Sequence, residues 1–287
     1  MRGLRLILVS ASLFVLQCLL AATAAFAQSD CNLVEAGHSH NDYLRKRPLY
    51  DALNLGFLSV EADIFFAKGN FSVAHTAFGR RKKQNLRKMY LEPLKARVDS
   101  CEGRVFCDCL QVFELMLDLK GKWDADRLKE LNASLAQFEG LFERVENNRV
   151  LPGPLRIVLS GAARMQWADT SDVRRYFFDG GMGSVASKIE STLLARNSTK
   201  YSSFFTWDGK DEMPPDERKA LEDLLYTATL NNRKIRFWKM PENERIWREF
   251  LDAGVRWMNV DNLERFARFF EKWTNSKQGE AKKKNAE

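Results

Sequence analysis

Histidine is scarce in this chain of 287 residues, and all three copies fall in two short motifs near its start. His38 and His40 belong to Gly-His-Ser-His-Asn-Asp-Tyr, and His75 belongs to Ser-Val-Ala-His-Thr. Between these motifs lies Val-Glu-Ala-Asp-Ile, which holds Glu61 and Asp63. Imidazole is the side chain whose ordinary pKa lies closest to neutrality, at about 6.5. Histidines that flank paired carboxylates therefore indicate proton transfer or metal binding.

The carboxylates predict a cation site. Glu61 and Asp63 are two residues apart on a predicted strand, so their side chains share one face, where two ionised carboxylates repel unless a cation lies between them. Asp118, in Met-Leu-Asp-Leu-Lys, would add a third oxygen from the neighbouring strand, and Asn41 could add a neutral one. An all-oxygen set suits a hard cation, so the expected cofactor is Mg²⁺ or Ca²⁺. Two exposed carboxylates at a strand end are the alternative.

The remaining residues of these motifs suit phosphoryl chemistry. Two histidines on separate loops can form a general acid–base pair, in which one deprotonates the attacking oxygen and the other protonates the leaving oxygen. Lys120 follows Asp118 by two residues and would lie on the same face, where it could hold an anionic phosphoryl oxygen. A solvent-facing cation at the strand end is the alternative for Lys120. The set predicts metal-dependent cleavage of a phosphodiester, by hydrolysis or by formation of a cyclic phosphate.

Short apolar runs alternate with amphipathic stretches along most of the chain. The runs are rich in Val, Ile, Phe and Trp and have lengths typical of strands. They are Asn32–Gly37, Leu58–Ile64, Gln111–Leu119, Leu155–Ser160, Arg174–Phe178, Ser203–Trp207, Lys234–Trp238 and Arg256–Val260. Amphipathic stretches that predict helices include Arg127–Val145, Asp216–Asn231 and Glu242–Ala253. Gly56 and Gly254 precede the second and last strands, where helix C-cap glycines are expected.

Eight strands with intervening helices predict an α/β fold, a single-domain (β/α)8 TIM barrel. A doubly wound open sheet is the alternative, but the first strand is not followed by a glycine-rich dinucleotide turn. In a barrel, His38, Glu61, Asp63 and Asp118 lie at or just beyond the C-terminal ends of the first three strands. Active sites of such barrels are built at that end.

The chain divides into three segments. Residues 1–27 read as a signal peptide, with two arginines, an apolar stretch and the cleavage motif Ala25-Phe26-Ala27. An uncleaved anchor is the alternative. We expect a secreted or periplasmic protein, with the barrel over residues 28–275 and a disordered basic tail over residues 276–287.

The cysteines and the net charge indicate where the protein is located and what it binds. Cleavage of the signal removes Cys18 and leaves Cys31, Cys101, Cys107 and Cys109, which suggest two disulfides rather than a zinc site. The net charge is +7, and a basic run at 80–83 follows His75. That run could attract a phosphate or an anionic membrane surface, or form an exposed charged turn. We expect a monomer with possible peripheral membrane contact, and no nucleic-acid partner.

These motifs resemble the phospholipase C-like phosphodiesterase superfamily. Gly-His-Ser-His-Asn-Asp-Tyr-Leu, Ser-Val-Glu-Ala-Asp-Ile and Val-Ala-His are similar to its His…Glu-x-Asp…His signature. The greatest similarity is to the altered-inheritance-of-mitochondria protein six group, whose pattern is His-Ser-His-Asn-Asp-Tyr followed by Ser-Val-Glu-Ala-Asp. The resemblance continues through Asp118-Leu-Lys120 and Arg236-Phe-Trp238 to Met258-Asn-Val-Asp-Asn262.

The resemblance implies a barrel, a divalent metal and two catalytic histidines. Positions matching Glu61, Asp63 and Asp118 hold the metal, those matching His75 and a strand-one histidine transfer protons, and those matching Lys120 and Trp238 face the substrate. The strand-one histidine is His40 by comparison with phosphoinositide-specific enzymes, which also makes Asn41 a metal ligand. It is His38 by comparison with glycerophosphodiesterases; we favour His40.

The resemblance leaves the substrate open among phosphodiester small molecules and lipid headgroups, including phospholipids and glycerophosphodiesters. The arginine and glycine of the glycerophosphodiesterase His-Arg-Gly motif are absent, and so is the cysteine loop that follows the second histidine in the venom phospholipases D. His-x-His metal hydrolases need further histidines on later strands, and none follows His75. A catalytically inactive, secreted ligand-binding barrel is the non-enzymatic alternative, and the completeness of the residue set argues against it.

Overall fold

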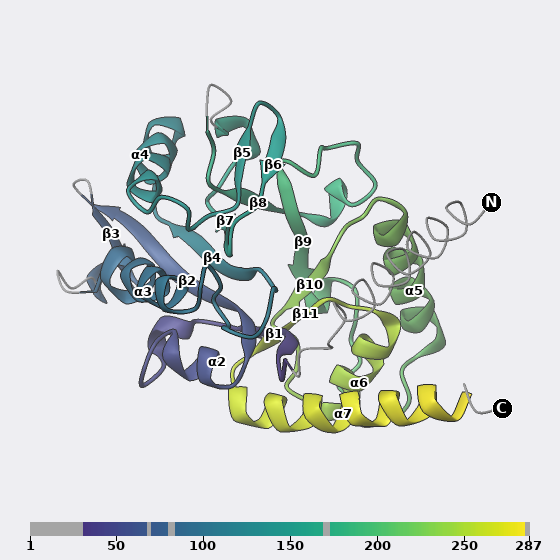
Figure 1. The fold of residues 1–287 in the computed structure, drawn as a ribbon. Coiled ribbons are helices and arrows are strands. Elements are labelled where there is room, and N and C mark those ends of the chain that lie inside the picture. Colours follow the sequence, from purple (N-terminus) through teal and green to yellow (C-terminus); the bar gives the residue numbers. More distant parts are fainter. Residues whose placement is uncertain (1–30, 68–69, 80–83, 169–172, 285–287) are drawn as a thin grey trace, which may run out of the picture. The chain divides into compact units, whose positions relative to one another are not determined.

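Eight parallel strands form a closed barrel in the computed structural model, which describes residues 31–67, 70–79, 84–168 and 173–284 (Figure 1). The residues from Asn32 onward form one compact unit. The barrel strands are β1 (Val34–Ser39), β2 (Phe57–Ala67), β4 (Phe113–Lys120), β7 (Leu155–Gly161), β8 (Phe177–Gly180), β9 (Leu194–Lys200), β10 (Ile235–Trp238) and β11 (Trp257–Val260). They pair in this order, and β11 pairs with β1 to close the barrel. The predicted TIM barrel is confirmed.

Helices lie between most of the strands. They are α2 (Tyr50–Asn54), α3 (Glu92–Ser100), α4 (Ala125–Ala136), α5 (Pro215–Leu230), α6 (Glu244–Ala253) and α7 (Leu263–Lys284). Short helical turns are η1 (Asp42–Leu44), η2 (Ala77–Gly79), the π-helix η3 (Arg87–Leu91), η4 (Met165–Trp167), η5 (Met182–Ser184) and η6 (Tyr201–Ser203). In the described parts of the β7–β8 and β8–β9 connections, these turns take the place of α-helices.

Two further pairs of strands are present in addition to the barrel. β3 (Asn70–Val73) pairs antiparallel with the end of β2, which therefore extends beyond the barrel wall. β5 (Arg144–Glu146) and β6 (Arg149–Leu151) form a separate two-stranded sheet. Because β3 turns the chain back along β2, it returns His75 to the level of Asp63, whose backbone carbonyl accepts a hydrogen bond from Ala74.

The sixth predicted strand, Ser203–Trp207, was wrong. The strand at this position is β9, Leu194–Lys200, and the predicted run instead follows the turn η6. Its apolar residues pack outside the barrel: the Phe205 ring lies 5.3 Å from that of Phe237 on β10 and 5.2 Å from that of Phe250 on α6. β9 itself reads as polar because Arg196 and Ser198 contact polar groups of the barrel interior.

Other boundaries also differ from the predictions, and the fifth predicted strand, Arg174–Phe178, is β8, Phe177–Gly180. The helix predicted over Arg127–Val145 ends at Ala136, and Gly140 then adopts a positive φ of 74° that a helix cannot contain. Residues 276–284, expected as disordered tail, continue α7. Lysine, glutamate and alanine favour helix, and Lys277 pairs with Asp252 at 3.0 Å on α6. Residues 285–287, the signal-peptide prediction over 1–27 and the basic run 80–83 lie outside the described residues.

The cysteines are oxidised as predicted. Cys101 and Cys107 form a disulfide, and each of the other two cysteines, Cys31 and Cys109, is in the oxidised, disulfide-bonded state. This oxidation is compatible with an exported protein. Among the described residues, no helix has the length and apolarity needed to span a bilayer.

The interior of the barrel contains polar side chains, whereas the layer between the barrel and its helices is apolar. Aromatic residues of α6 and α7 pack between the helices, including Trp247 and Phe266, whose ring centroids lie 4.9 Å apart. Inside the barrel, Arg196 pairs with Glu114 at 2.8 Å and donates to Ser59 Oγ at 3.2 Å. Breaking one partner of such a buried pair costs about 3–5 kcal/mol, so these contacts hold the strands in one register.

Asp42 fixes the loop that follows β1. Its buried carboxylate accepts hydrogen bonds from Ser39 Oγ at 2.9 Å, from the Tyr90 hydroxyl at 2.9 Å and from the Leu49 backbone N–H at 2.6 Å. Leu49 has a positive φ of 67°, which a leucine rarely adopts. The Asp42 carboxylate thus anchors the segment that carries Asn41 and Tyr43.

Asp42→Ala should lower the free energy of unfolding by about 3 kcal/mol, because it leaves two buried hydroxyls and a backbone N–H without their acceptor. Urea denaturation followed by circular dichroism measures this loss. Asp99→Ala is the control, since Asp99 is an exposed carboxylate paired with Lys95 and should cost less than about 1 kcal/mol. Equal losses in the two variants would show that Asp42 does not anchor the loop.

Candidate active site

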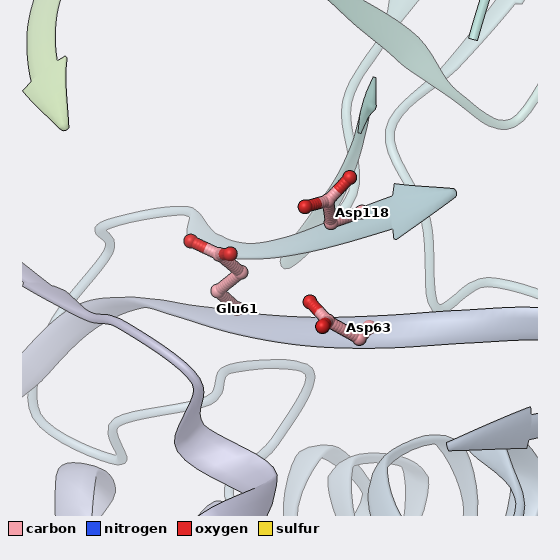
Figure 2. A group of neighbouring side chains, drawn as sticks. All are labelled: Glu61, Asp63 and Asp118. Carbon is pink, nitrogen blue, oxygen red and sulfur yellow. The ribbon is translucent and has the colours of Figure 1, made fainter. Parts of the chain in front are cut away.

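Three carboxylates converge at the C-terminal end of the barrel. Glu61 and Asp63 lie on β2 and Asp118 lies on β4, where Asp63 and Asp118 are register partners. One oxygen from each lies within 4.8 Å of the others. Figure 2 shows the three side chains projecting from the two neighbouring strands toward one another. The predicted cluster of carboxylates is therefore present.

The two aspartates have oxygens suited to a cation. Asp63 Oδ1 and Asp118 Oδ1 are buried and have no hydrogen-bond partner among the residues that the structure describes. Burial raises the pKa of both carboxyls, and neighbouring carboxylates raise it further, against the opposing effect of Lys120. A buried acceptor without a partner is costly, and a divalent cation would satisfy both oxygens. The donor set fits Mg²⁺ or Ca²⁺.

Glu61 is held in the ionised state. Burial acts to raise its pKa, but the hydrogen bond from His38 and the charge of Arg236 outweigh burial and lower the pKa to about 2. Arg236 Nη2 lies 2.8 Å from Glu61 Oε2 and 2.6 Å from Asn259 Oδ1. His38 Nε2 contacts the same Oε2 at 3.1 Å. Both contacts use Oε2, so Oε1 is the oxygen available to a cation.

His38 is a buried, neutral support for Glu61. Its residue exposure is 0 %, and Nδ1 lies 2.7 Å from Ser59 Oγ while Nε2 faces Glu61. Burial, reinforced by the charge of Arg236, lowers the pKa of His38 to about 3. Because both ring nitrogens are engaged, neither can exchange a proton with a substrate. Of the two histidines on and after β1, His40 is therefore the one whose ring is not held on both sides by buried partners.

His40 is paired with an acid from the far end of the chain. Its Nδ1 lies 2.8 Å from Asp261 Oδ1, and its side chain is 29 % exposed. Burial lowers the pKa of His40, but the Asp261 hydrogen bond and the charges of Glu61 and Asp261 raise it to a greater extent, so the net shift is upward. Arg45 donates to the Asp261 and His40 carbonyls. With Nδ1 held by Asp261, Nε2 is left for chemistry.

Tyr43 connects His75 to Asp63. Its hydroxyl lies 2.8 Å from Asp63 Oδ2, 3.0 Å from His75 Nδ1 and 3.0 Å from Asn41 Oδ1. The single hydroxyl proton can serve one acceptor, and the carboxylate of Asp63 is the strongest. The hydroxyl then accepts from His75 Nδ1–H, which leaves the lone pair of His75 on Nε2. Burial and Asp63 raise the pKa of Tyr43, so the hydroxyl stays protonated.

Asn41 and Lys120 lie beside the carboxylates, and Trp238 lies at the end of β10. Asn41 has a positive φ of 48° and contacts Asp63 through the Tyr43 hydroxyl. Lys120 Nζ lies 2.6 Å from Asp118 Oδ2 and 3.4 Å from Asp63 Oδ2. Burial lowers the pKa of Lys120, but Asp118 raises it more, so the ammonium persists. Trp238 ends β10 and is 36 % exposed, with Lys239 over its ring.

Sequence reasoning missed three contributors: Tyr43, Arg236 and Asp261. Each lies inside a motif that the sequence already singled out, so its presence there was the available signal. Their partners were not available from sequence, because Arg236 and Glu61 are 175 residues apart and His40 and Asp261 are 221 apart. Only the closed barrel, in which β11 returns to β1, brings these residues together.

Comparison with solved structures gives a weak likeness. Thermotoga maritima Cel5A, a structure described in complex with cellobiose, aligns with a TM-score of 0.43 and 12 % identity, over 79 % of this chain and 90 % of that one. A likeness at this level carries no argument. The barrel stands on its own strand pairing.

Sequence relatives are more informative. An altered inheritance of mitochondria protein 6 homolog of Arthroderma benhamiae is 26 % identical over 258 residues, covering 79 % of this chain and 81 % of that protein. The altered inheritance of mitochondria protein 6 of Kluyveromyces lactis is 22 % identical, covering 84 % and 73 %. That of Lachancea thermotolerans is 39 % identical, covering 81 % and 65 %.

The family match covers the site itself. Residues 28–179, more than half of the 287 in the chain, match the family described as the AIM6-like phosphodiesterase domain. This segment contains β1, β2 and β4 together with the three carboxylates, the three histidines and Lys120. The chain belongs to the family of the AIM6-like phosphodiesterase domain.

Proposed function

We propose that this protein cleaves a phosphodiester with the help of a divalent cation, Mg²⁺ or Ca²⁺, held by Glu61, Asp63 and Asp118. The observation that carries the proposal is the convergence of these three carboxylates within 4.8 Å, with two uncommitted histidine nitrogens on neighbouring loops. The phosphodiesterase domain of the family supports the same reaction class. The proposed substrate is a phospholipid or a glycerophosphodiester headgroup.

The bound cation would supply Lewis-acid stabilisation of negative charge on the phosphoryl oxygens. Lys120 contributes to the same end, since its ammonium lies beside Asp118 and can hold a non-bridging oxygen. Trp238 is proposed to contact the substrate at the same end of the barrel. Asn41 is a further candidate ligand that would reach the cation by rotating its amide oxygen away from Tyr43.

The two histidines divide the proton transfers. His75 Nε2 accepts the proton of the attacking oxygen, which belongs to water in hydrolysis or to a substrate hydroxyl in cyclisation. A new phosphorus–oxygen bond forms as the ester bond to the leaving alcohol breaks. His40 Nε2 then delivers a proton to that leaving oxygen, a role that suits an imidazolium stabilised by Asp261.

Replacing either proton carrier should reduce turnover by about 100-fold or more, because general acid–base catalysis contributes about 10²–10⁴. A substrate is first identified by phosphorus NMR in the presence of Mg²⁺ or Ca²⁺. The panel contains lysophospholipids, glycerophosphodiesters and inositol lipids. The rates of His75→Ala and His40→Ala are then measured on that substrate. A chelator should abolish the reaction in the unaltered protein.

Asp99→Ala serves as the matched control and should keep full activity, because this exposed carboxylate on α3 pairs with Lys95 of the same helix. Full activity of a folded His75→Ala protein contradicts the proposal. So does a metal-loaded protein that cleaves nothing in the panel, which favours an inactive ligand-binding barrel.

Cation binding should stabilise the folded protein. At a cation concentration 100 times the dissociation constant, the free energy of unfolding rises by about 2.7 kcal/mol, since the unfolded chain lacks the converged carboxylates. Differential scanning calorimetry should show an increase in Tm of about 5–10 °C. Asp118→Asn should lose this increase while Asp99→Asn retains it; an equal shift in both variants places the cation elsewhere.

Without a cation, Asp118 should destabilise the protein as the pH rises. Its pKa is higher in the folded than in the unfolded protein, so its stabilising contribution is complete below the unfolded value of about 3.9 and is lost as the pH rises through the folded value. Asp118→Asn removes this loss. In chelator, the variant should therefore gain stability relative to the unaltered protein between pH 4 and pH 8, as measured by urea denaturation. A pH-independent difference contradicts the shift.

A further inference from the structure

Four side-chain oxygens on four neighbouring strands of the barrel have no hydrogen-bond partner in the described part of the chain. They are Asp63 Oδ1 on β2, Asp118 Oδ1 on β4, Ser160 Oγ on β7 and Asp179 Oδ1 on β8. Asp118 is the register partner of both Asp63 and Ser160. Leu159 pairs with Phe178, so Ser160 and Asp179 are each one residue beyond a paired position. The four oxygens thus belong to one row around the barrel.

The cation site accounts for only half of this row. Asp63 and Asp118 belong to the group of three carboxylates that could share an ion, and that group does not include Asp179. A buried polar atom that lacks a partner costs about as much as a lost hydrogen bond, so the other two oxygens need a partner of their own. Both residues are half-buried and lie near the ends of β7 and β8, at the same end of the barrel as the three carboxylates, although the two oxygens themselves are buried.

The groups around Asp179 restrict what that ligand is. Asp179 Oδ2 accepts a hydrogen bond from Ser198 Oγ at 2.6 Å, which leaves Oδ1 as the unused acceptor. Burial raises the pKa of Asp179 to about 6, while the charges of Arg196 and Arg236 act to lower it. Two guanidinium groups oppose a second cation, while Asp179 and Asp118 oppose an anion. A neutral hydroxyl group, which donates to Asp179 and exchanges a hydrogen bond with Ser160, satisfies both oxygens.

We propose that Asp179 and Ser160 form a subsite for a hydroxyl group on the alcohol part of the substrate, and so select diesters that carry one. This inference rests on the proposed function, because it assumes that the phosphoryl group lies at the neighbouring carboxylates. Ser198 is a positioning residue, since it orients the Asp179 carboxylate without facing the ligand. The alternative partner of both oxygens is an ordered water.

Two diesters with one leaving group test the subsite. Glyceryl p-nitrophenyl phosphate carries free hydroxyls and propyl p-nitrophenyl phosphate carries none, so the ratio of their kcat/KM values isolates hydroxyl recognition. The unaltered protein should prefer the glyceryl diester by about tenfold, the effect of one charge-assisted hydrogen bond. Asp179→Ala should bring the ratio to about one. Asp179→Asn keeps an acceptor oxygen and should retain part of the preference.

Ser160→Ala is the second variant and should lower the ratio of the two kcat/KM values by about threefold. If Asp179→Ala does not fold, Ser160→Ala tests the subsite in its place. Asp223→Asn, an exposed carboxylate on α5 paired with Lys219, is the control and should keep the ratio of the unaltered protein. A ratio near one in the unaltered protein, as expected if ordered water fills the subsite, overturns the proposal. A preference that survives both Asp179→Ala and Ser160→Ala also overturns the proposal. Such a preference is expected if the substrate's own hydroxyl attacks the phosphorus and a cyclic phosphate is released.

If neither diester is cleaved, the proposed function fails and binding decides the subsite separately. Calorimetric titration with the same two diesters then measures their dissociation constants. Tighter binding of the glyceryl diester that is lost in Asp179→Ala supports the subsite without any catalysis. Equal binding of the two diesters overturns it.

Discussion

Electrostatic repulsion among Glu61, Asp63 and Asp118 is the constraint on which this site depends. Three carboxylates within 4.8 Å cannot all remain ionised in a partly buried setting without compensating charge. The protein supplies part of it: Arg236 and His38 hold Glu61, and Lys120 lies against Asp118. The unpartnered oxygens of the two aspartates show that the compensation is incomplete. A divalent cation completes it, and for that reason we regard the cluster as a cation site.

The polar barrel interior is the support of this arrangement. Arg196 and Glu114 form a buried pair beneath the site, and Ser59 connects Arg196 to His38. His38 in turn orients Glu61, so a chain of contacts runs from the barrel interior to the candidate ligands. Buried pairs of this kind do little for stability, but they specify one geometry. We therefore interpret the buried charges as positioning Glu61 rather than as adding to stability.

Much of the fold and part of the site could be predicted from the sequence, because both leave local patterns. Apolar runs of strand length predicted most of the barrel strands. Glu61, Asp63 and Asp118 converge because the C-terminal ends of the strands meet at one end of a parallel barrel. β9 could not be found, since its contacts inside the barrel are made by Arg196 and Ser198. The burial of His38 and the pairing of His40 with Asp261 depend on barrel closure, which no local pattern records.

The most direct test of the account is anomalous diffraction from crystals soaked in Mn²⁺, which stands in for Mg²⁺ at oxygen sites. We expect a single strong peak between β2 and β4, within bonding distance of oxygens from Glu61, Asp63 and Asp118, and no such peak in Asp118→Asn crystals. A peak at another position, or none at saturating Mn²⁺ with these side chains accessible, would contradict the claim that the three carboxylates form a cation site.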